Sequence, residues 1–185
     1  MKVLTTKLPG VLIVDPTVFG DTRGFFMESF NKRRYAEAGI SGPFVQDNIS
    51  LSQRGVLRGL HLQHPYSQGK LVQVLRGEVF DVAVDVRTGS PTFGQWTGEY
   101  LSHSNRLQLY VPAGFAHGFL VTSDEALFAY KCTDYYHTET ERSIRWDDPR
   151  IGIEWPTRDV SLSAKDNDAL LLDDVSTELL PSYPQ

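Results

Sequence analysis

The segment EVFDVAVDVR, residues 78–87, alternates apolar and polar or small side chains with a period of two. One face carries Phe80, Val82, Val84 and Val86, and the other carries Asp81, Ala83 and Asp85. A period of two places successive side chains on opposite faces of an extended chain, which is typical of a β-strand. The segment therefore predicts a strand, and the rest of the chain is interpreted around it.

Similar short runs recur on both sides of this segment and predict further strands. They lie at 11–14, 25–30, 44–50, 56–62, 71–76, 107–111, 118–122 and 126–131, and the N-terminal stretch 1–16 also reads as strand. Glycine and proline separate the runs. Many short strands at close spacing favour an all-β sandwich, jelly roll or barrel.

Only two stretches predict helix. Residues 31–38 follow Asn31 as a possible N-cap and stop at Gly39, and a turn or two is expected from about residue 163 onward. The peripheral helices are therefore short, and a fold of this kind can enclose a small-molecule cavity at its mouth.

Length and composition limit the class of protein. The chain has 185 residues, and 41% hydrophobic and 22% charged residues are ordinary for a folded protein, so one domain spanning 1–185 is expected. A net charge of −5 gives no basic surface for nucleic acid, and no apolar run is long enough for a membrane helix. Cys132 is the single cysteine, which excludes a disulfide framework. A cytoplasmic protein is predicted.

Two motifs resemble those of the cupin jelly rolls. The segment VPAGFAHGF (111–119) contains Pro-x-Gly-x-x-His ending at His117, and GLHLQ followed by GKLVQVLRG contains His61, Gln63 and Lys70. In metal-binding cupins the first motif supplies two histidines and a glutamate. Here Gln63 and Lys70 stand at the second and third of these positions, and an ammonium group repels a metal ion. The expected fold is a cupin-type double-stranded β-helix with no metal.

Each of these residues also has an ordinary structural interpretation. Lys70 fits a solvated turn equally well, His117 fits a hydrogen-bonded histidine at a strand end, and His61 fits a structural histidine of the barrel. Their joint placement at cupin ligand positions, which point into one cavity, favours a functional role.

Seven blocks in order along the chain resemble the dTDP-4-dehydrorhamnose 3,5-epimerases. They are DTRGFFMESF (21–30), QDNISLS (46–52), GVLRGLHLQ (55–63), SPTFGQW (90–96), VPAGFAHGF (111–119), YKCTDYY (130–136) and LSAKD (162–166). The resemblance implies an isomerase of dTDP-L-rhamnose biosynthesis that uses no cofactor. Its substrate would be dTDP-4-dehydro-6-deoxy-D-glucose, whose ketone acidifies the protons on carbons 3 and 5, so that both centres invert through an enolate to give dTDP-4-dehydro-L-rhamnose.

The resemblance implies His61 as the base, with a carboxylate beside it to fix the imidazole tautomer. By motif that carboxylate is Asp166, and Asp168 is the alternative. Lys70 would stabilise the oxyanion that develops on carbon 4.

The acid on the opposite face would be Tyr130, because inversion at carbon requires a donor and an acceptor on different sides. Tyr136, where the family has a mobile aromatic near the substrate, is the reserve candidate. His117 and Arg58 would complete the polar floor, and Arg58 is suited to forking onto a diphosphate.

The nucleotide end of the substrate is assigned by resemblance alone. It would be bound by Arg23, Phe26, Glu28, Gln46, Asn48 and Lys165. Residues from about 1 to 30 would cross to a partner subunit in a homodimer, so Arg23, Phe26 and Glu28 would serve the neighbour's site.

Three other functions compete with this prediction. The chain could be a related enzyme that inverts one centre only, or a keto-isomerase, acting on a related dTDP-ketosugar. A non-catalytic sugar-nucleotide-binding cupin would have lost the His–Asp pair or the acid tyrosine. A metal-dependent cupin dioxygenase or isomerase is disfavoured by Gln63 and Lys70.

Overall fold

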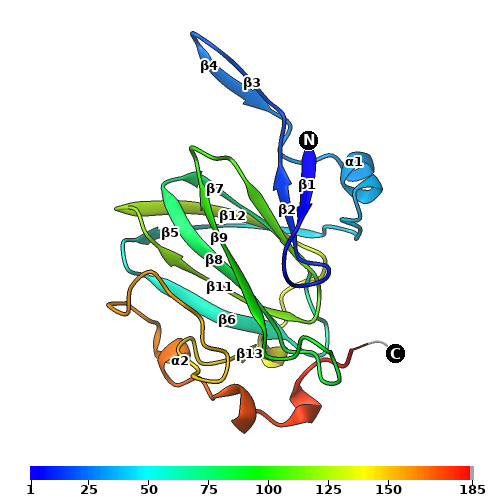
Figure 1. The fold of residues 1–185 in the computed structure, drawn as a ribbon, viewed down its shortest axis with the longest axis vertical. Helices are drawn as coiled ribbons and strands as arrows, with labels where there is room; N and C mark the ends of the chain where they lie inside the picture. The colour runs from blue at the N-terminus through cyan, green and yellow to red at the C-terminus, as the bar shows by residue number, and fades with distance from the viewer. Residues whose placement is uncertain (184–185) are drawn as a thin grey trace.

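The structure, a computed structural model, describes residues 1–183, so the last two residues of the predicted single domain lie outside the described part. Two antiparallel sheets face one another and form a barrel (Figure 1). One contains, in spatial order, β1 (Lys2–Thr5), β2 (Leu12–Asp15), β10 (Gln108–Val111), β7 (Lys70–Arg76), β12 (Glu125–Cys132) and β5 (Gln46–Gln53). The other contains β13 (Glu141–Ser143), β6 (Leu57–Gln63), β11 (Phe115–Val121), β8 (Glu78–Asp85) and β9 (Trp96–Ser102). The predicted all-β fold of the cupin type is confirmed.

Strand β8, which contains the alternating segment 78–85, lies within the five-stranded sheet, between β11 and β9. Its apolar face packs outward against the C-terminal segment, in a cluster with Ile151, Ile153 and Leu172. Its other face points between the sheets, where Asp81 is fully buried. Both faces are therefore covered, which explains why the polar residues on this strand are not solvent-exposed.

The remaining strands follow the predicted runs except at a few places. The run 25–30 is shorter in the structure, where β3 (Val18–Asp21) and β4 (Gly24–Met27) form a separate hairpin. Strand β9 escaped prediction because Gly98 interrupts its pattern. That glycine is required by packing, since a Cβ there would lie 2.4 Å from the Phe80 ring.

The helices are short and peripheral, as expected. Helix α1 (Lys32–Glu37) begins after Asn31, whose side chain accepts the backbone N–H of Arg34. Helix α2 (Ala164–Asn167) begins after Ser163, and single 3₁₀ turns cover Thr138–Thr140, Leu172–Asp174 and Thr177–Leu179. The tail packs on its own barrel, because Leu172 and Leu180 join the cluster outside the five-stranded sheet.

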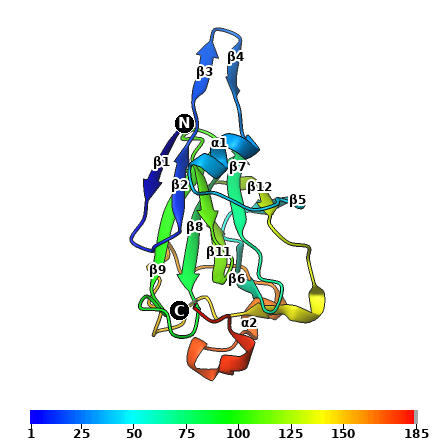
Figure 2. The ribbon, with the colours of Figure 1, turned by 90° about the vertical axis from the view of Figure 1, so that its right-hand side faces the viewer.

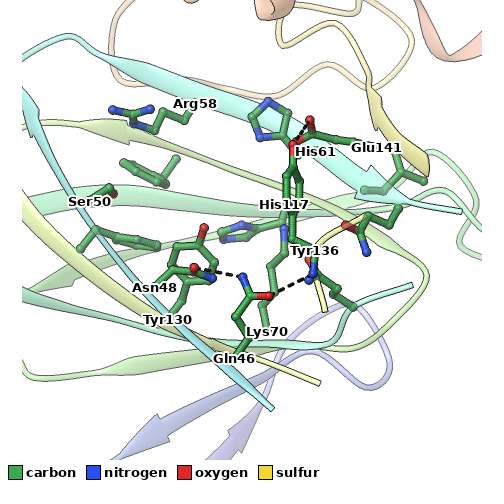
Figure 3. Close-up of a pocket in the computed structure, with 15 residues that line it drawn as sticks. Gln46, Asn48, Ser50, Arg58, His61, Lys70, His117, Tyr130, Tyr136 and Glu141 are labelled. Carbon is green, nitrogen blue, oxygen red and sulfur yellow. Dashed lines mark hydrogen bonds between the residues drawn. The ribbon is translucent and has the colours of Figure 1, made fainter. Parts of the chain in front are cut away.

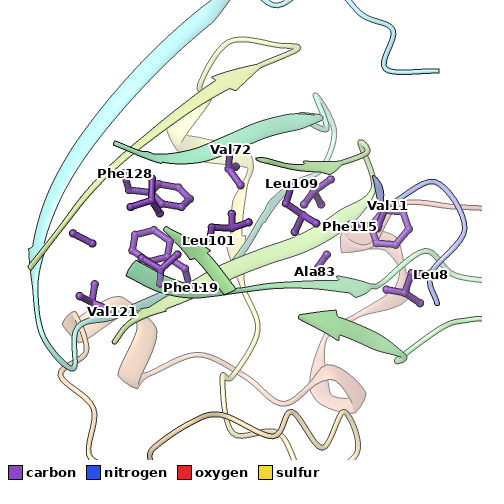
Figure 4. Packing of buried hydrophobic residues seen from close by; sticks show 14 residues of the cluster. Leu8, Val11, Val72, Ala83, Leu101, Leu109, Phe115, Phe119, Val121 and Phe128 are labelled. Carbon is purple, nitrogen blue, oxygen red and sulfur yellow. The ribbon is translucent and has the colours of Figure 1, made fainter. Parts of the chain in front are cut away.

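The space between the sheets is divided into a packed part and a hollow part. Side chains of both sheets, among them Val72, Leu109, Phe115 and Leu101, fill the packed part (Figure 4). Phe119 and Phe128 stack with ring centroids 4.2 Å apart at the boundary and also line the hollow part. The core thus forms the apolar floor of a cavity.

An irregularity in β6 shapes that cavity. His117 of β11 lies opposite His61, but Phe119, two residues on, lies opposite Arg58, three residues back. The extra residue is a β-bulge, which turns a side chain to the other face of the strand. Arg58 and His61 would otherwise point to opposite faces, and the bulge lets both line one cavity.

We expect Gly59→Ala to destabilise the protein by about 3 kcal/mol, because the bulge requires glycine. Gly59 has φ +131°, and an added Cβ would lie 2.6 Å from Gly118 Cα and 2.9 Å from the His117 carbonyl oxygen. Gly39→Ala is the control, since Gly39 also has positive φ but open space around it, and should cost about 1 kcal/mol. Urea unfolding measures both, and equal losses would contradict the steric argument.

The β3–β4 hairpin stands away from the barrel, as two perpendicular views agree (Figures 1 and 2). Phe19, Phe25 and Phe26 are more than half exposed on it. Within residues 1–183 no helix is long and apolar enough to cross a bilayer.

Candidate active site

A cavity of about 380 Å³ opens between the two sheets above the Phe119–Phe128 floor. Figure 3 shows polar side chains converging on it from both walls. Eight of the thirteen residues predicted for the site line it: Gln46, Asn48, Arg58, His61, Lys70, His117, Tyr130 and Tyr136. The structure therefore brings these eight predicted residues together around one cavity.

His61 is held by a carboxylate. Its Nε2 lies 2.5 Å from Asp166 Oδ1, and Asp166 is almost fully buried at the first turn of α2, whereas Asp168 is exposed. Burial alone would raise the pKa of Asp166, but the hydrogen bond and charge of His61, together with Ser163 and Lys165, outweigh it and hold the pKa below its usual value. Because Nε2 is occupied, Nδ1 is the nitrogen left to accept a proton from a ligand.

Lys70, at the start of β7, extends into the cavity (Figure 3). Burial lowers the pKa of its ammonium group, and the nearby Cys132, Glu141 and Asp81 oppose that shift. Among the described residues no hydrogen bond or ion pair engages this ammonium group. An unpaired cation inside a cavity is available to an anionic ligand atom.

Tyr130 stands on β12, in the sheet that faces His61. Its ring packs against Phe128, and burial raises the pKa of its phenol above the ordinary value of 10.0. The phenol is therefore protonated near neutral pH and can donate. His61 and Tyr130 thus offer a proton acceptor and a proton donor on opposite walls.

His117 belongs to a buried pair that the sequence did not indicate. Its Nε2 lies 2.9 and 3.1 Å from the two oxygens of Asp81, which is fully buried on β8. The carboxylate fixes the imidazole, so His117 can present only Nδ1 to the cavity. In the sequence, Asp81 shares a strand face with the small residue Ala83, and this was the available signal that Asp81 lies in the interior.

Glu141 of β13 joins two predicted site residues, Tyr136 and Lys165, at the cavity mouth. Its Oε2 accepts the Tyr136 hydroxyl at 3.0 Å and lies 2.8 Å from Lys165 Nζ. Burial acts to raise the pKa of Glu141, but the bonds from Lys165 and Tyr136 lower it overall. Lys165 thus contacts the site through Glu141. Glu141 itself was not predicted from the sequence.

Strand β5 supplies a polar wall. Gln46 donates to Asn48 Oδ1 at 3.0 Å and accepts the backbone N–H of Tyr136 at 3.0 Å (Figure 3). On the opposite wall Arg58 donates from Nε to Ser52 at 3.0 Å, which leaves the other guanidinium nitrogens for an anion.

Three predicted residues do not reach the cavity of their own chain. Arg23 is exposed on the β3–β4 hairpin and pairs with Asp21 at 2.6 Å, and Phe26 is exposed beside it. Glu28 accepts from Arg34 at 3.0 Å at the base of the hairpin. Their predicted service to a neighbouring subunit stays a prediction.

The four residues at the cupin ligand positions do not fit a metal ion. His61 and His117 each use Nε2 on a carboxylate, and the Gln63 amide is hydrogen-bonded to backbone. Lys70 brings a positive charge. Across residues 1–183 no three His, Cys, Asp or Glu side chains are grouped as metal ligands.

Comparison with known sequences identifies similar proteins over most of the chain. A family model described as dTDP-4-dehydrorhamnose 3,5-epimerase matches residues 5–174. The enzyme of that name from Shigella flexneri is 58% identical over 168 residues, which are 90% of this chain and 93% of the relative. The dTDP-4-dehydrorhamnose 3-epimerase of Streptomyces niveus is 41% identical over 187 residues, 99% of this chain and 90% of the relative.

A solved structure is similar over the whole chain. It is the dTDP-6-deoxy-D-glucose-3,5-epimerase of Legionella pneumophila in complex with dTDP-4-keto-L-rhamnose, with a TM-score of 0.97 and 56% identity. The match covers 100% of this chain and 99% of that one. The aligned region therefore spans both sheets and all the segments that form the cavity.

Proposed function

This chain belongs to the dTDP-4-dehydrorhamnose 3,5-epimerase family, and on that premise we propose that His61 and Tyr130 carry out its proton transfers. The chain is an isomerase that epimerises dTDP-4-dehydro-6-deoxy-D-glucose at carbons 3 and 5. The observation that carries the proposal is the placement of a carboxylate-held histidine and a protonated tyrosine on facing sheets.

In the first half of each inversion, His61 Nδ1 takes the proton from the carbon beside the ketone. The C–H electron pair moves into a carbon–carbon double bond, and the carbonyl pair moves to oxygen 4 as an oxyanion. Asp166 stabilises the imidazolium that forms, because its carboxylate is ionised and hydrogen-bonded to Nε2.

In the second half, the Tyr130 phenol gives its proton to the opposite face of the same carbon, and the ketone re-forms. Lys70 stabilises the oxyanion between the two steps, and His117 lies at the same polar floor. His61 and Tyr130 return to their starting protonation through solvent, so solvent hydrogen enters each inverted carbon. The residues at the cupin positions do this with no metal.

The test is solvent deuterium incorporation after chelator treatment, followed by NMR on dTDP-4-dehydro-6-deoxy-D-glucose. We expect deuterium at both carbons 3 and 5 at an unchanged rate. Activity that disappears with the chelator and returns with a metal would overturn metal-independent catalysis.

An epimerase acting on one carbon is the second candidate, because the relative from Streptomyces niveus is a 3-epimerase. The same spectrum distinguishes the two. Deuterium confined to carbon 3 would identify a single-centre enzyme, and no exchange despite binding of dTDP would leave a binding protein.

We also propose that two copies of the chain exchange their β3–β4 hairpins. Phe19, Phe25 and Phe26 are exposed on the hairpin, and Ile49 and Leu51 are exposed on the outer face of β5. Exposed apolar clusters of this kind mark an interface. Arg23 would then meet the phosphates bound at the neighbour's cavity. A cytoplasmic location and the absence of nucleic-acid and membrane partners stay predictions of the sequence.

Mixing two inactive variants tests the exchange. In a hybrid of Arg23→Ala and His61→Asn subunits, the Arg23→Ala subunit keeps His61 and receives an intact hairpin. About a quarter of all sites should regain activity after refolding an equal mixture. No recovery, with dimers present by light scattering, would show that each hairpin serves its own subunit.

A further inference from the structure

Gln63, at the end of β6, contacts the backbone of two loops with one buried amide group. Its Nε2 donates to the carbonyl oxygens of Tyr66 at 2.8 Å and Tyr135 at 3.1 Å. Its Oε1 accepts the backbone N–H of His137 at 2.8 Å. The Gln63 side chain is only 5% exposed, so its own amide group is buried.

These contacts lie on both sides of Tyr136. The residue before it and the residue after it are both bonded to Gln63, and its own N–H donates to Gln46 Oε1 at 3.0 Å. The Tyr136 hydroxyl is held separately by Glu141. The backbone around Tyr136 is therefore held by Gln63 and Gln46, and the Tyr136 side chain is held by Glu141 at the cavity mouth.

We propose that Gln63 is a positioning residue that fixes Tyr136 as a wall of the cavity, so that the sugar stays bound until both carbons have inverted. This inference rests on the proposed function. Both polar atoms of the Gln63 amide are bonded to loop backbone, so although Gln63 lines the cavity it acts through Tyr136.

Gln63 is the residue whose side chain bonds the loop backbone on both sides of Tyr136. Tyr135 and Tyr136 are exposed, and the loop joins β12 to β13 with only one 3₁₀ turn of its own. Loss of the Gln63 amide would remove the donor that the Tyr66 and Tyr135 carbonyl groups share, and the loop would relax to find other partners.

The consequence for the reaction follows from its two stages. Both carbons are served by one histidine and one tyrosine, so the half-inverted sugar must remain in the cavity and shift within it. A loose wall lets that sugar dissociate after one inversion. Substrate affinity and the yield of the doubly inverted product then both fall, while proton removal by His61 continues.

The experiment compares Gln63→Glu and Gln63→Leu with the wild-type protein. Gln63→Glu keeps the acceptor for His137 and loses the donor to Tyr66 and Tyr135. Gln53→Leu is the matched control, because Gln53 is exposed on β5 away from the loop. For both Gln63 variants we expect KM to rise about tenfold and kcat for exchange at the first carbon to change less than about threefold. The fraction of singly deuterated sugar should also rise.

A second background separates positioning from stability. In Tyr136→Ala, adding Gln63→Glu should change KM and the singly deuterated fraction by less than about twofold, because the residue it acts through is gone. Additive effects would overturn the inference. Amide hydrogen exchange gives a readout without activity: His137 should exchange faster in Gln63→Leu than in Gln63→Glu.

The outcomes distinguish the two proposals. If wild-type protein exchanges neither carbon, the proposed function fails. If it exchanges both and the Gln63 variants keep wild-type KM and product ratio while remaining folded by thermal melting, only the positioning role fails.

Discussion

His61→Asn should abolish deuterium incorporation at both carbon 3 and carbon 5, with a fall in kcat of about a thousandfold. Asparagine retains a hydrogen-bonding group near Asp166 but cannot accept and hold a proton at neutral pH. The same loss is expected at both carbons because one base would serve both. Two cavity histidines bond a carboxylate through Nε2, but the ring of His61 is partly open to solvent whereas that of His117 is buried. Rates of exchange at each carbon, measured by NMR, test it.

His103→Asn is the control, since His103 is exposed on the loop after β9 and its ring hydrogen-bonds to the Gly77 carbonyl and Ser104, away from the cavity. It should keep full activity. Retention of dTDP binding by His61→Asn would show that the cavity is intact. Exchange that persists at one carbon in His61→Asn would contradict a single base for both centres.

Lys70→Met should lower kcat about a hundredfold to a thousandfold, which is the usual cost of removing one donor to a developing oxyanion. Methionine has similar length and no charge, so the cavity keeps its shape. Lys131→Met is the control, because Lys131 is on β12 beside Tyr130 but pairs with Asp47 outside the cavity. A Lys70→Met enzyme with wild-type kcat would exclude the cation from the mechanism.

The alkaline limb of the pH profile should report Lys70. Burial lowers the pKa of Lys70 below its usual 10.5, which brings loss of the ammonium proton to lower pH, and raises the pKa of Tyr130 above its usual 10.0, which moves loss of the phenol proton to higher pH. Activity requires the protonated form and is lost as pH passes through the Lys70 pKa. Lys70→Arg should move this limb to higher pH, whereas Tyr130→Phe should lower the rate without moving it. A limb that moves in Tyr130→Phe alone would assign it to the phenol.

Local pattern was enough to predict most of the fold. The alternation in 78–85 and the neighbouring runs depends only on which residue is next in the chain, and β2, β5, β6, β7, β10, β11 and β12 formed where that alternation lies. Asn31 capped α1 for the same local reason. Strand β9 was missed because the demand for Gly98 comes from Phe80 on another strand.

The residue types of the site were also readable, because a lysine and a glutamine stand where cupins place metal ligands. The residues that bond to these site residues were not readable from the sequence. Glu141 and the contacts of Gln63 carry no local signal, since a glutamate after a loop or a glutamine at a strand end is ordinary until its neighbours are known. For Asp81 the strand face that it shares with Ala83 indicated an interior position but not the bond to His117.

The sequence by itself determined that the chain forms short strands around a cavity and which histidine, tyrosine and lysine are candidates, because strand alternation and motif spacing are properties of nearby residues. Only the tertiary structure decided that Asp166 and not Asp168 meets His61, that β6 bulges so that Arg58 shares its wall, and that Gln63 holds the loop of Tyr136. The physical reason is distance along the chain: the His61–Asp166 bond joins residues 105 positions apart, and such a contact exists only after the sheets have closed.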